Sequence, residues 1–289
     1  MKRKITPMAL NDEHDVQAED TTVEAATEDT TSRRSGMDLT NNAQVYDAGA
    51  EAFHTKAPKL LSWEAVGRPA LEHSLADMDL SQAQIYDGGS ASGRITKQLI
   101  AMGAQPQNIT GVEISPDQVA LAQQDIPEAH FIVGDLSTVE LPSDHFDVAV
   151  RHMVDEHLSN EALAATSRNT LDALKPGGRL VTIWTDPQRV AHTEHVTEEG
   201  PFVTNFPWGG QGTNYYREVD RSAQIIRDAG FVIDRIEELP IPDGDDVRDI
   251  DPQAYDNYMG QGYGHGEAGI RVRAVIIAHK PAVGEVVAA

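Results

Sequence analysis

The chain has 289 residues, which is enough for one or two domains, and 40% of them are hydrophobic, which excludes a wholly disordered protein. It contains no cysteine, so disulfides, cysteine-ligated metal centres and thiol nucleophiles are excluded. Its 23 basic and 46 acidic residues give a formal net charge of −23, the wrong sign for a surface that binds nucleic-acid phosphates. No apolar run is long enough for a membrane span, and no hydrophobic signal region follows the start. We therefore expect a cytoplasmic protein that binds neither membranes nor nucleic acid.

The first 36 residues differ in composition from the rest of the chain. They are rich in Thr, Glu, Asp and Ala and poor in large apolar residues, and such a segment buries too little apolar surface to offset its ordering entropy. We predict a disordered acidic tail over 1–36, one folded domain over 37–283 with N-terminal helices within 41–72, and a short tail over 284–289.

Apolar runs with strand character alternate with amphipathic helical stretches along the domain. Strands are predicted at 84–87, 108–113, 130–133, 146–150, 179–184, 231–236 and 271–279. Helices are predicted at 95–102, 116–124, 161–174 and 217–229. Strands that alternate with helices of this length indicate βαβ units, so the predicted fold class is α/β with a mostly parallel sheet.

In open α/β sheets, ligands bind at the carboxyl ends of the strands. Here an acidic residue stands at the carboxyl end of each of the first three predicted strands. The first strand runs into Asp87-Gly88-Gly89-Ser90-Ala91-Ser92-Gly93, the second ends in Glu113-Ile114 and the third in Asp135-Leu136. A carboxylate after the second strand can accept hydrogen bonds from ribose hydroxyls, and one after the third can accept from an adenine amino group. Position 90 is serine, which disfavours the G-x-G-x-x-G dinucleotide site, and no phosphate-binding G-x-x-x-x-G-K-[ST] loop is present.

These motifs, in this order, resemble the class I S-adenosylmethionine-dependent methyltransferases, close to the small-molecule type found in ubiquinone and menaquinone biosynthesis. The run 87–93 is similar to that family's D-x-G-x-G-x-G, and Leu174-Lys175-Pro176-Gly177-Gly178 is similar to its turn before the fifth strand. The resemblance implies a Rossmann-like sheet with an antiparallel last strand and helices on both faces. It also implies S-adenosyl-L-methionine as cofactor and in-line methyl transfer to a small-molecule acceptor.

The resemblance also implies which residues bind the cofactor. These are Asp87, Gly88, Gly89, Ser90, Gly93, Glu113, Ile114, Asp135, Leu136 and Arg151. Ala91 departs from the pattern because it stands at the family's middle glycine. Two alternatives therefore stay open, namely another reaction of bound S-adenosylmethionine, such as intramolecular cyclisation or lyase chemistry, and a non-catalytic cofactor-binding scaffold.

The acceptor side of the site is less clearly marked in the sequence. His152 and His157 follow the fourth strand and are candidate general bases, although a histidine there can equally serve the start of the next helix. We expect no metal. The segment 186–216 is predicted to be a long lid-like loop, because long loops are usually functional and this one carries several aromatic residues. The predicted substrate-binding residues are Tyr46, Phe206, Trp208, Tyr215 and Tyr216. The sequence identifies neither the acceptor atom nor the oligomeric state.

Overall fold

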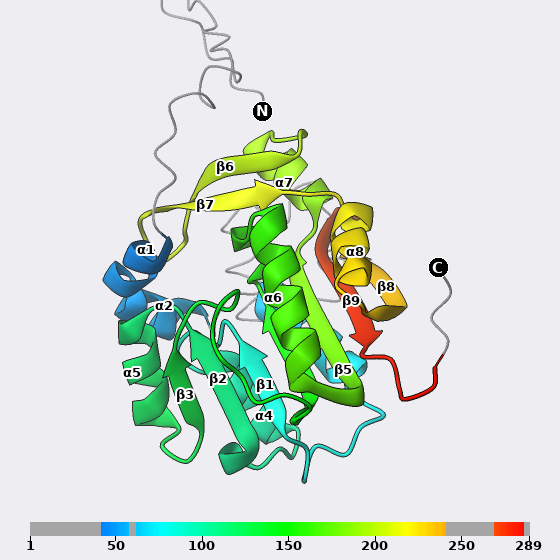
Figure 1. Ribbon diagram of the computed structural model, residues 1–289. Helices are drawn as coiled ribbons and strands as arrows, with labels where there is room; N and C mark the ends of the chain where they lie inside the picture. Colours follow the sequence, from blue (N-terminus) through cyan, green and yellow to red (C-terminus); the bar gives the residue numbers. More distant parts are fainter. Residues whose placement is uncertain (1–41, 58–61, 241–268, 286–289) are drawn as a thin grey trace, which may run out of the picture. The chain divides into compact units, whose positions relative to one another are not determined.

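A computed structural model describes residues 42–57, 62–240 and 269–285 of the chain (Figure 1). All of these described residues belong to one compact unit. The predicted acidic tail, residues 1–36, lies outside the described residues, as do residues 286–289 of the predicted C-terminal tail. Among the described helices, none combines the length and the hydrophobicity needed to cross a membrane.

A seven-stranded sheet forms the centre of the domain, in the order β3-β2-β1-β4-β5-β9-β8. The strands are β1 (Ile85–Gly88), β2 (Ile109–Glu113), β3 (His130–Val133), β4 (Phe146–His152), β5 (Leu174–Thr185), β8 (Val232–Pro240) and β9 (Arg271–His279). Strands β1 to β5 pair in parallel, and β9 is antiparallel to both of its neighbours. The predicted fold class, including the antiparallel last strand, is confirmed. The strand order reverses between β1 and β4, which is the point where such sheets bind ligands.

Helices cover both faces of this sheet (Figure 1). They are α1 (Asn42–Ala48), α2 (Ala50–Lys56), the π-helix η2 (Trp63–Gly67), α3 (Arg68–Ser74), α4 (Arg94–Ala101), the 3-10 turn η3 (Pro106–Asn108), α5 (Pro116–Asp125), the 3-10 turn η4 (Asp155–His157), α6 (Asn160–Ala173), α7 (Pro187–Glu194) and α8 (Val219–Asp228). The side chains of β4 alternate between the faces, as a pleated strand requires. Ala149 joins the core on the side of α8, while Val148 and Val150 join the core on the side of α3 and α4.

Side-chain caps fix where several helices begin. The Ser115 hydroxyl accepts a hydrogen bond from the Gln118 amide at 3.2 Å, and Pro116 occupies the first position of α5. The Asp186 carboxylate accepts one from the Gln188 amide at 2.8 Å at the start of α7. Such caps satisfy amides that have no partner inside the helix. They place the helix starts directly after the strands, at the edge of the sheet where a ligand is expected.

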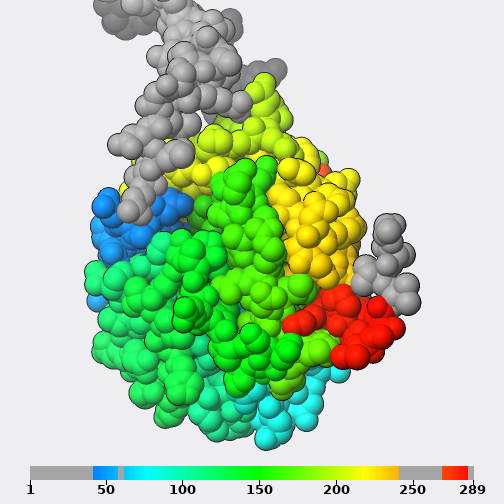
Figure 2. Space-filling view, viewed as in Figure 1, coloured from blue at the N-terminus to red at the C-terminus, as the bar shows by residue number. Residues whose placement is uncertain are grey.

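The segment 186–216 differs from the prediction of a long loop. It forms α7 followed by a two-stranded hairpin, β6 (Gly200–Asn205) paired with β7 (Gln211–Tyr216). Gly209 and Gly210 form the turn with positive φ angles of 111° and 81°, and a glycine-rich turn between two runs of alternating apolar residues is typical of a hairpin. The hairpin packs against α1 through β7, and in Figure 2 it appears in yellow-green at the upper side of the molecule.

Candidate functional site

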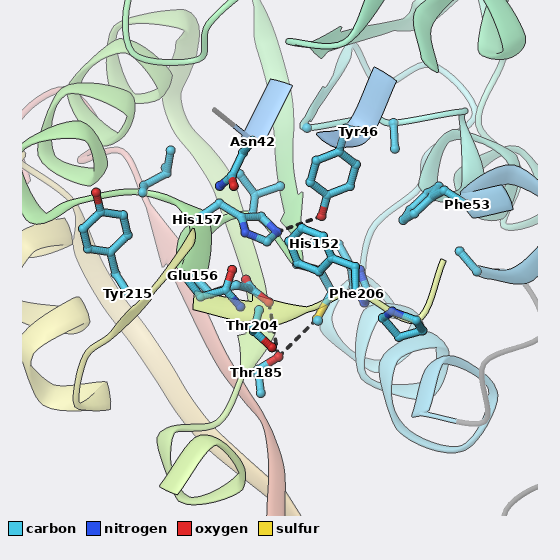
Figure 3. A pocket seen from close by; sticks show the side chains of 18 of the residues that line it. Asn42, Tyr46, Phe53, His152, Glu156, His157, Thr185, Thr204, Phe206 and Tyr215 are labelled. Atoms are coloured by element: carbon cyan, nitrogen blue, oxygen red, sulfur yellow. Dashed lines mark hydrogen bonds between the residues drawn. The ribbon is translucent and has the colours of Figure 1, made fainter. Parts of the chain in front are cut away.

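A cavity of about 660 Å³ opens at the carboxyl ends of the parallel strands, a volume within the roughly 300–1,000 Å³ usual for small-molecule sites. Its wall combines residues that follow β1, β2, β3 and β4 with residues from α1, α2 and the β6–β7 hairpin (Figure 3). It therefore extends on both sides of the boundary between β1 and β4, where the strand order reverses.

The carboxylate of Glu113, at the end of β2, is held in a fixed orientation beside the glycine-rich loop. The Ala91 amide donates to its Oε2 at 3.1 Å and the Ser115 amide donates to its Oε1 at 3.0 Å. The side chain is only 7% exposed, and burial raises the pKa of Glu113. Each carboxylate oxygen keeps a further lone pair for a ligand. The chain thus presents an oriented acceptor at the place predicted for ribose hydroxyls.

Asp87 and Ser90 contribute buried polar atoms next to this carboxylate. Thr96 donates its hydroxyl to Asp87 Oδ2 at 2.7 Å, while Asp87 Oδ1 and Ser90 Oγ have no protein partner. Burial raises the pKa of Asp87 to about 7. Gly89, between the two, has a φ of +76°, and a Cβ there would lie 2.2 Å from the Val154 side chain. Buried polar atoms are rarely left unpaired in proteins, so the Ser90 hydroxyl, which lines the cavity, fits a bound ligand with hydrogen-bonding groups.

The wall beyond Glu113 is apolar with one acid. Ile114, Gly134 and Leu136 line it, and Ile114 is 44% exposed, which is unusual for so large an apolar side chain. Asp135 also lines the wall, and its Oδ1 accepts from both the amide and the hydroxyl of Ser137, at 2.8 and 2.7 Å. The arrangement suits a planar ring with a polar edge.

Some of the residues predicted to bind the cofactor do not line the cavity. Asp87, Gly88 and Gly93 lie beneath the loop, and Arg151 is fully buried, with its Nε 2.9 Å from Asp155 Oδ1 and its Nη1 3.4 Å from the Ser167 hydroxyl. The prediction of Arg151 as a cofactor contact is therefore wrong. Its side chain points toward α6 and neutralises a buried acid.

His157 lies in the cavity wall and is hydrogen-bonded to Tyr46. The Tyr46 hydroxyl is 2.9 Å from His157 Nε2 (Figure 3). Burial, together with the charges of Glu156 and Glu113, raises the pKa of Tyr46, so this phenol stays protonated. A protonated phenol has a proton to donate, and we assign it as the donor, which places the proton of the imidazole on Nδ1. In this tautomer His157 offers a hydrogen-bond donor rather than a basic nitrogen.

His152 is buried beside a guanidinium. Arg94 Nη2 is 3.2 Å from His152 Nδ1, and the Trp63 ring packs edge-on against the imidazole with centroids 5.1 Å apart. Burial, and then the charge of Arg94, hold the pKa of His152 well below its usual range, so the ring is neutral. Because Nδ1 accepts from Arg94, the proton resides on Nε2 and no basic nitrogen remains. The geometry argues against the predicted role of His152 as a general base.

Aromatic residues from two distant segments form the outer wall. Tyr46 and Phe53 come from α1 and α2, and Phe206 and Trp208 come from the hairpin. The rings of Phe206 and Trp208 stack with centroids 4.9 Å apart, and Phe53 meets Trp208 edge-on at 4.7 Å. Tyr215 lines the same cavity.

Tyr216 differs from the prediction that it contacts substrate. It is 7% exposed and packs against Val190 and Phe202, which line the cavity, but Tyr216 itself is not part of the lining. Its hydroxyl donates to Glu218 at 2.6 Å. Tyr215 and Tyr216 are neighbours in a strand, so their side chains point to opposite faces, and only one of them reaches the cavity.

Residues 85–178 match a family model described as a methyltransferase domain. Over this segment the chain is similar to a methyltransferase domain. It contains the glycine-rich loop, Glu113, Asp135 and the residues that follow β4. The match confirms the predicted class of enzyme, a methyltransferase whose cofactor is S-adenosylmethionine. It does not distinguish the quinone-biosynthesis subtype from other methyltransferases. No curated protein matches the sequence.

Solved structures share the fold at low sequence identity. An S-adenosylmethionine-dependent methyltransferase from Mesorhizobium loti is 18% identical, with a TM-score of 0.55 over 76% of this chain and 98% of its own. The magnesium protoporphyrin IX methyltransferase of Synechocystis PCC 6803, solved with S-adenosylhomocysteine, is 16% identical, with a TM-score of 0.57 over 83% of this chain and 98% of its own. The [4+2]-cyclase SpnF is 18% identical, with a TM-score of 0.57 over 83% of this chain and 95% of its own. At these identities the likeness shows the fold.

Two hydrogen bonds join α1 to the hairpin beside the cavity. The Asn42 side chain donates from Nδ2 to the Thr213 carbonyl and accepts at Oδ1 from the Thr213 amide, both at 2.8 Å. We call this pair the Asn42 clamp. Nearby, a Cβ on Gly49 would lie 2.9 Å from Trp208 Cδ1, so glycine is what lets the α1–α2 turn contact this ring. Together these contacts hold the aromatic wall over the cavity.

Several residues that line the cavity were not predicted from the sequence. They are Trp63, Arg94, Glu156, Thr185, Arg189 and Arg273. Arg94 directly follows the glycine-rich loop, and its guanidinium lies 4.6 Å from the Trp63 ring centroid. The position of Arg94 directly after the loop could have predicted that it lines the cavity. Arg273 lies on the last strand, far from any motif, and could not have been predicted in this way. Within the described part of the chain, no group of three or more potential metal ligands is assembled.

Ala91 adopts the left-handed backbone that favours glycine, with a φ of +45°. A Cβ in this conformation costs about 1–2 kcal/mol, which the lower entropy cost of folding alanine partly offsets. We expect Ala91→Gly to leave the free energy of unfolding unchanged or to raise it by up to about 1 kcal/mol in urea denaturation. The control Ala120→Gly, at an exposed position within α5, should lower it by about 1 kcal/mol. A similar loss of unfolding free energy in Ala91→Gly and Ala120→Gly would contradict the interpretation that the backbone of Ala91 is strained.

Proposed function

We propose that the protein transfers the methyl group of S-adenosylmethionine to a small-molecule acceptor. The observation that carries this proposal is that a single cavity joins two differently built halves. One half holds the glycine-rich loop and the strand-end acids of a methyltransferase domain, and the other half has aromatic walls. The halves meet where the strand order reverses, so a cofactor and an acceptor bound in them would be neighbours.

The residues present fit the cofactor. Glu113 would hold the ribose hydroxyls, while Ile114, Asp135 and Leu136 would hold the adenine. The unpartnered Ser90 hydroxyl and the guanidinium of Arg94, which both line the cavity, suit the ammonium and carboxylate of the methionine half. When bound, S-adenosylmethionine supplies a methyl group activated by its sulfonium. The contribution of this chain is to orient the two reactants and to exclude water.

The proposed acceptor is small and has an apolar body. Tyr46, Phe206, Trp208 and Tyr215 supply apolar and aromatic surface, and the Asn42 clamp ties together the two segments that carry these residues. A polymer such as nucleic acid would also meet a chain of net charge −23. The finer proposal, an acceptor of the kind methylated in ubiquinone and menaquinone biosynthesis, is compatible with these apolar walls.

Cyclisation or lyase chemistry on the bound cofactor is the alternative, and a non-catalytic scaffold is a further one. The first has the fold likeness to SpnF and the substitution at Ala91 in its favour. However, Ala91 adopts the left-handed backbone conformation that glycine favours, which argues against an altered loop at this position. A scaffold gains no support from a cavity with a separate aromatic half. We therefore favour methyl transfer.

The cofactor assignment can be tested by isothermal titration calorimetry. S-adenosylhomocysteine is expected to bind and to raise the melting temperature of the full chain, because a ligand that binds only the folded state stabilises it. NAD at the same concentration should do neither, since the loop at 87–93 lacks the dinucleotide pattern. Tight binding of NAD, or no binding of S-adenosylhomocysteine, would overturn the proposed function.

A further inference from the structure

Glu156 is a buried carboxylate in the acceptor half of the cavity, and the resemblance assigns it no role. Its side chain is 5% exposed and belongs to η4, the turn that follows β4. The Thr185 hydroxyl donates to Oε1 at 3.2 Å, while Oε2 has no hydrogen-bond partner in the protein. Figure 3 shows Glu156 between His157 and Thr185 in the cavity wall. A buried carboxylate with one oxygen unpaired is costly unless a ligand donates to it.

The position of Glu156 places it where the two halves of the cavity meet. It follows β4, the strand next to β1 at the reversal of strand order, and Thr185 holds it from the end of β5. On the other side of β1 lie the loop and Glu113, which are proposed to hold the cofactor. The charge of Glu156 also acts on the Tyr46 phenol in the aromatic wall. It is therefore close to both the proposed acceptor surface and the point of methyl transfer.

The neighbouring histidine is less suited to remove a proton. His157 Nε2 is occupied by the Tyr46 hydroxyl at 2.9 Å, and in the assigned tautomer Nδ1 carries the ring proton. His152 has its Nδ1 occupied by Arg94. Glu156 Oε2 is thus the basic atom in this part of the wall that is both buried and unpaired among the described residues.

We propose that Glu156 is the general base and that the acceptor carries an O–H or N–H at its reacting atom. The inference rests on the proposed function. A lone pair of that oxygen or nitrogen forms the new bond to the methyl carbon, and the carbon–sulfur bond breaks with its electron pair left on sulfur. The acceptor's proton passes to Glu156 Oε2. The products are the methylated acceptor, S-adenosylhomocysteine and a neutral carboxylic acid, so charge and atoms balance.

Sinefungin tests this placement without knowledge of the acceptor. It is an S-adenosylmethionine analogue with a primary amine, protonated at neutral pH, where the sulfonium methyl would be, and it should donate to Glu156 Oε2. S-adenosylhomocysteine has no group there. By calorimetry the wild-type protein is expected to bind sinefungin about 10-fold or more tightly than S-adenosylhomocysteine, as for hydrogen bonds to a charged group. Glu156→Gln should abolish most of that preference and leave the affinity for S-adenosylhomocysteine unchanged.

A matched control is Glu194→Gln, which removes a carboxylate that also lines the cavity but is solvent-exposed and hydrogen-bonded to Thr204 at 3.0 Å. It should keep the preference for sinefungin. If both ligands bind and Glu156→Gln retains the wild-type preference, the role of Glu156 is refuted while the proposed function stands. If neither ligand binds the wild-type protein, both proposals fall.

Discussion

Asp155→Leu is expected to lower the free energy of unfolding by about 3–5 kcal/mol, because it leaves the Arg151 guanidinium buried without its counter-charge. The pair is almost completely inaccessible, with side-chain exposures of 0% for Arg151 and 1% for Asp155. Two contacts join them, Nε to Oδ1 at 2.9 Å and Nη2 to Oδ2 at 3.0 Å, and Thr182 donates to the same carboxylate at 2.7 Å. Urea denaturation followed by circular dichroism measures the change.

Two further variants separate the loss of pairing from a general effect of mutation. Lys175→Met breaks a half-exposed ion pair with Asp147 and should cost less than about 1 kcal/mol. The double variant Arg151→Met/Asp155→Leu removes both charges and should recover most of the stability, as replacement of a buried pair by apolar residues often does. A double variant no more stable than Asp155→Leu would show that packing, rather than the unpaired charge, causes the loss.

Glu113→Ala is expected to weaken binding of S-adenosylhomocysteine by roughly 10- to 150-fold, the equivalent of losing hydrogen bonds to a charged group. The carboxylate is oriented in advance by the amides of Ala91 and Ser115, so little ordering cost is paid on binding. Its removal also leaves those two amides without their acceptor. Both effects act on the half of the cavity proposed for the cofactor.

Calorimetric titration of the folded variant measures this loss. Glu128→Ala removes an acid of the same type from an exposed position, and its affinity should equal that of the wild-type protein. This control accounts for the change in net charge. Normal binding by Glu113→Ala would remove Glu113 from the cofactor site.

The sheet and the cofactor half were predictable because the information is local. Each parallel strand presents its carboxyl end at the same edge, so Glu113 and Asp135 had to converge once their strands were identified. Side-chain direction was not predictable in the same way. Tyr215 and Tyr216 differ only in strand register, and the direction of Arg151 depends on Asp155, a buried partner four residues further along the chain.

The acceptor half was less predictable because it is assembled from segments far apart in sequence. Phe206 and Trp208 meet Tyr46 and Phe53 only after α1 and α2 pack beside the hairpin. Nothing in the sequence of 186–216 alone predicts that contact. The hairpin itself could have been predicted, because a glycine-rich turn separates two runs of alternating apolar residues there. Glu156 was overlooked because its importance comes from an unpaired oxygen, which only the packed structure reveals.

The Asn42 clamp has a consequence for which substitutions the β6–β7 hairpin can accept. Both of its hydrogen bonds use the Asn42 side chain but only the backbone of Thr213. Substitutions along the hairpin therefore leave this closure intact, provided that the strand pairing is kept. The aromatic residues by which the hairpin lines the cavity can therefore change independently of the contact that ties the hairpin to α1. A single asparagine thus lets one wall of the cavity vary while the hairpin stays in place.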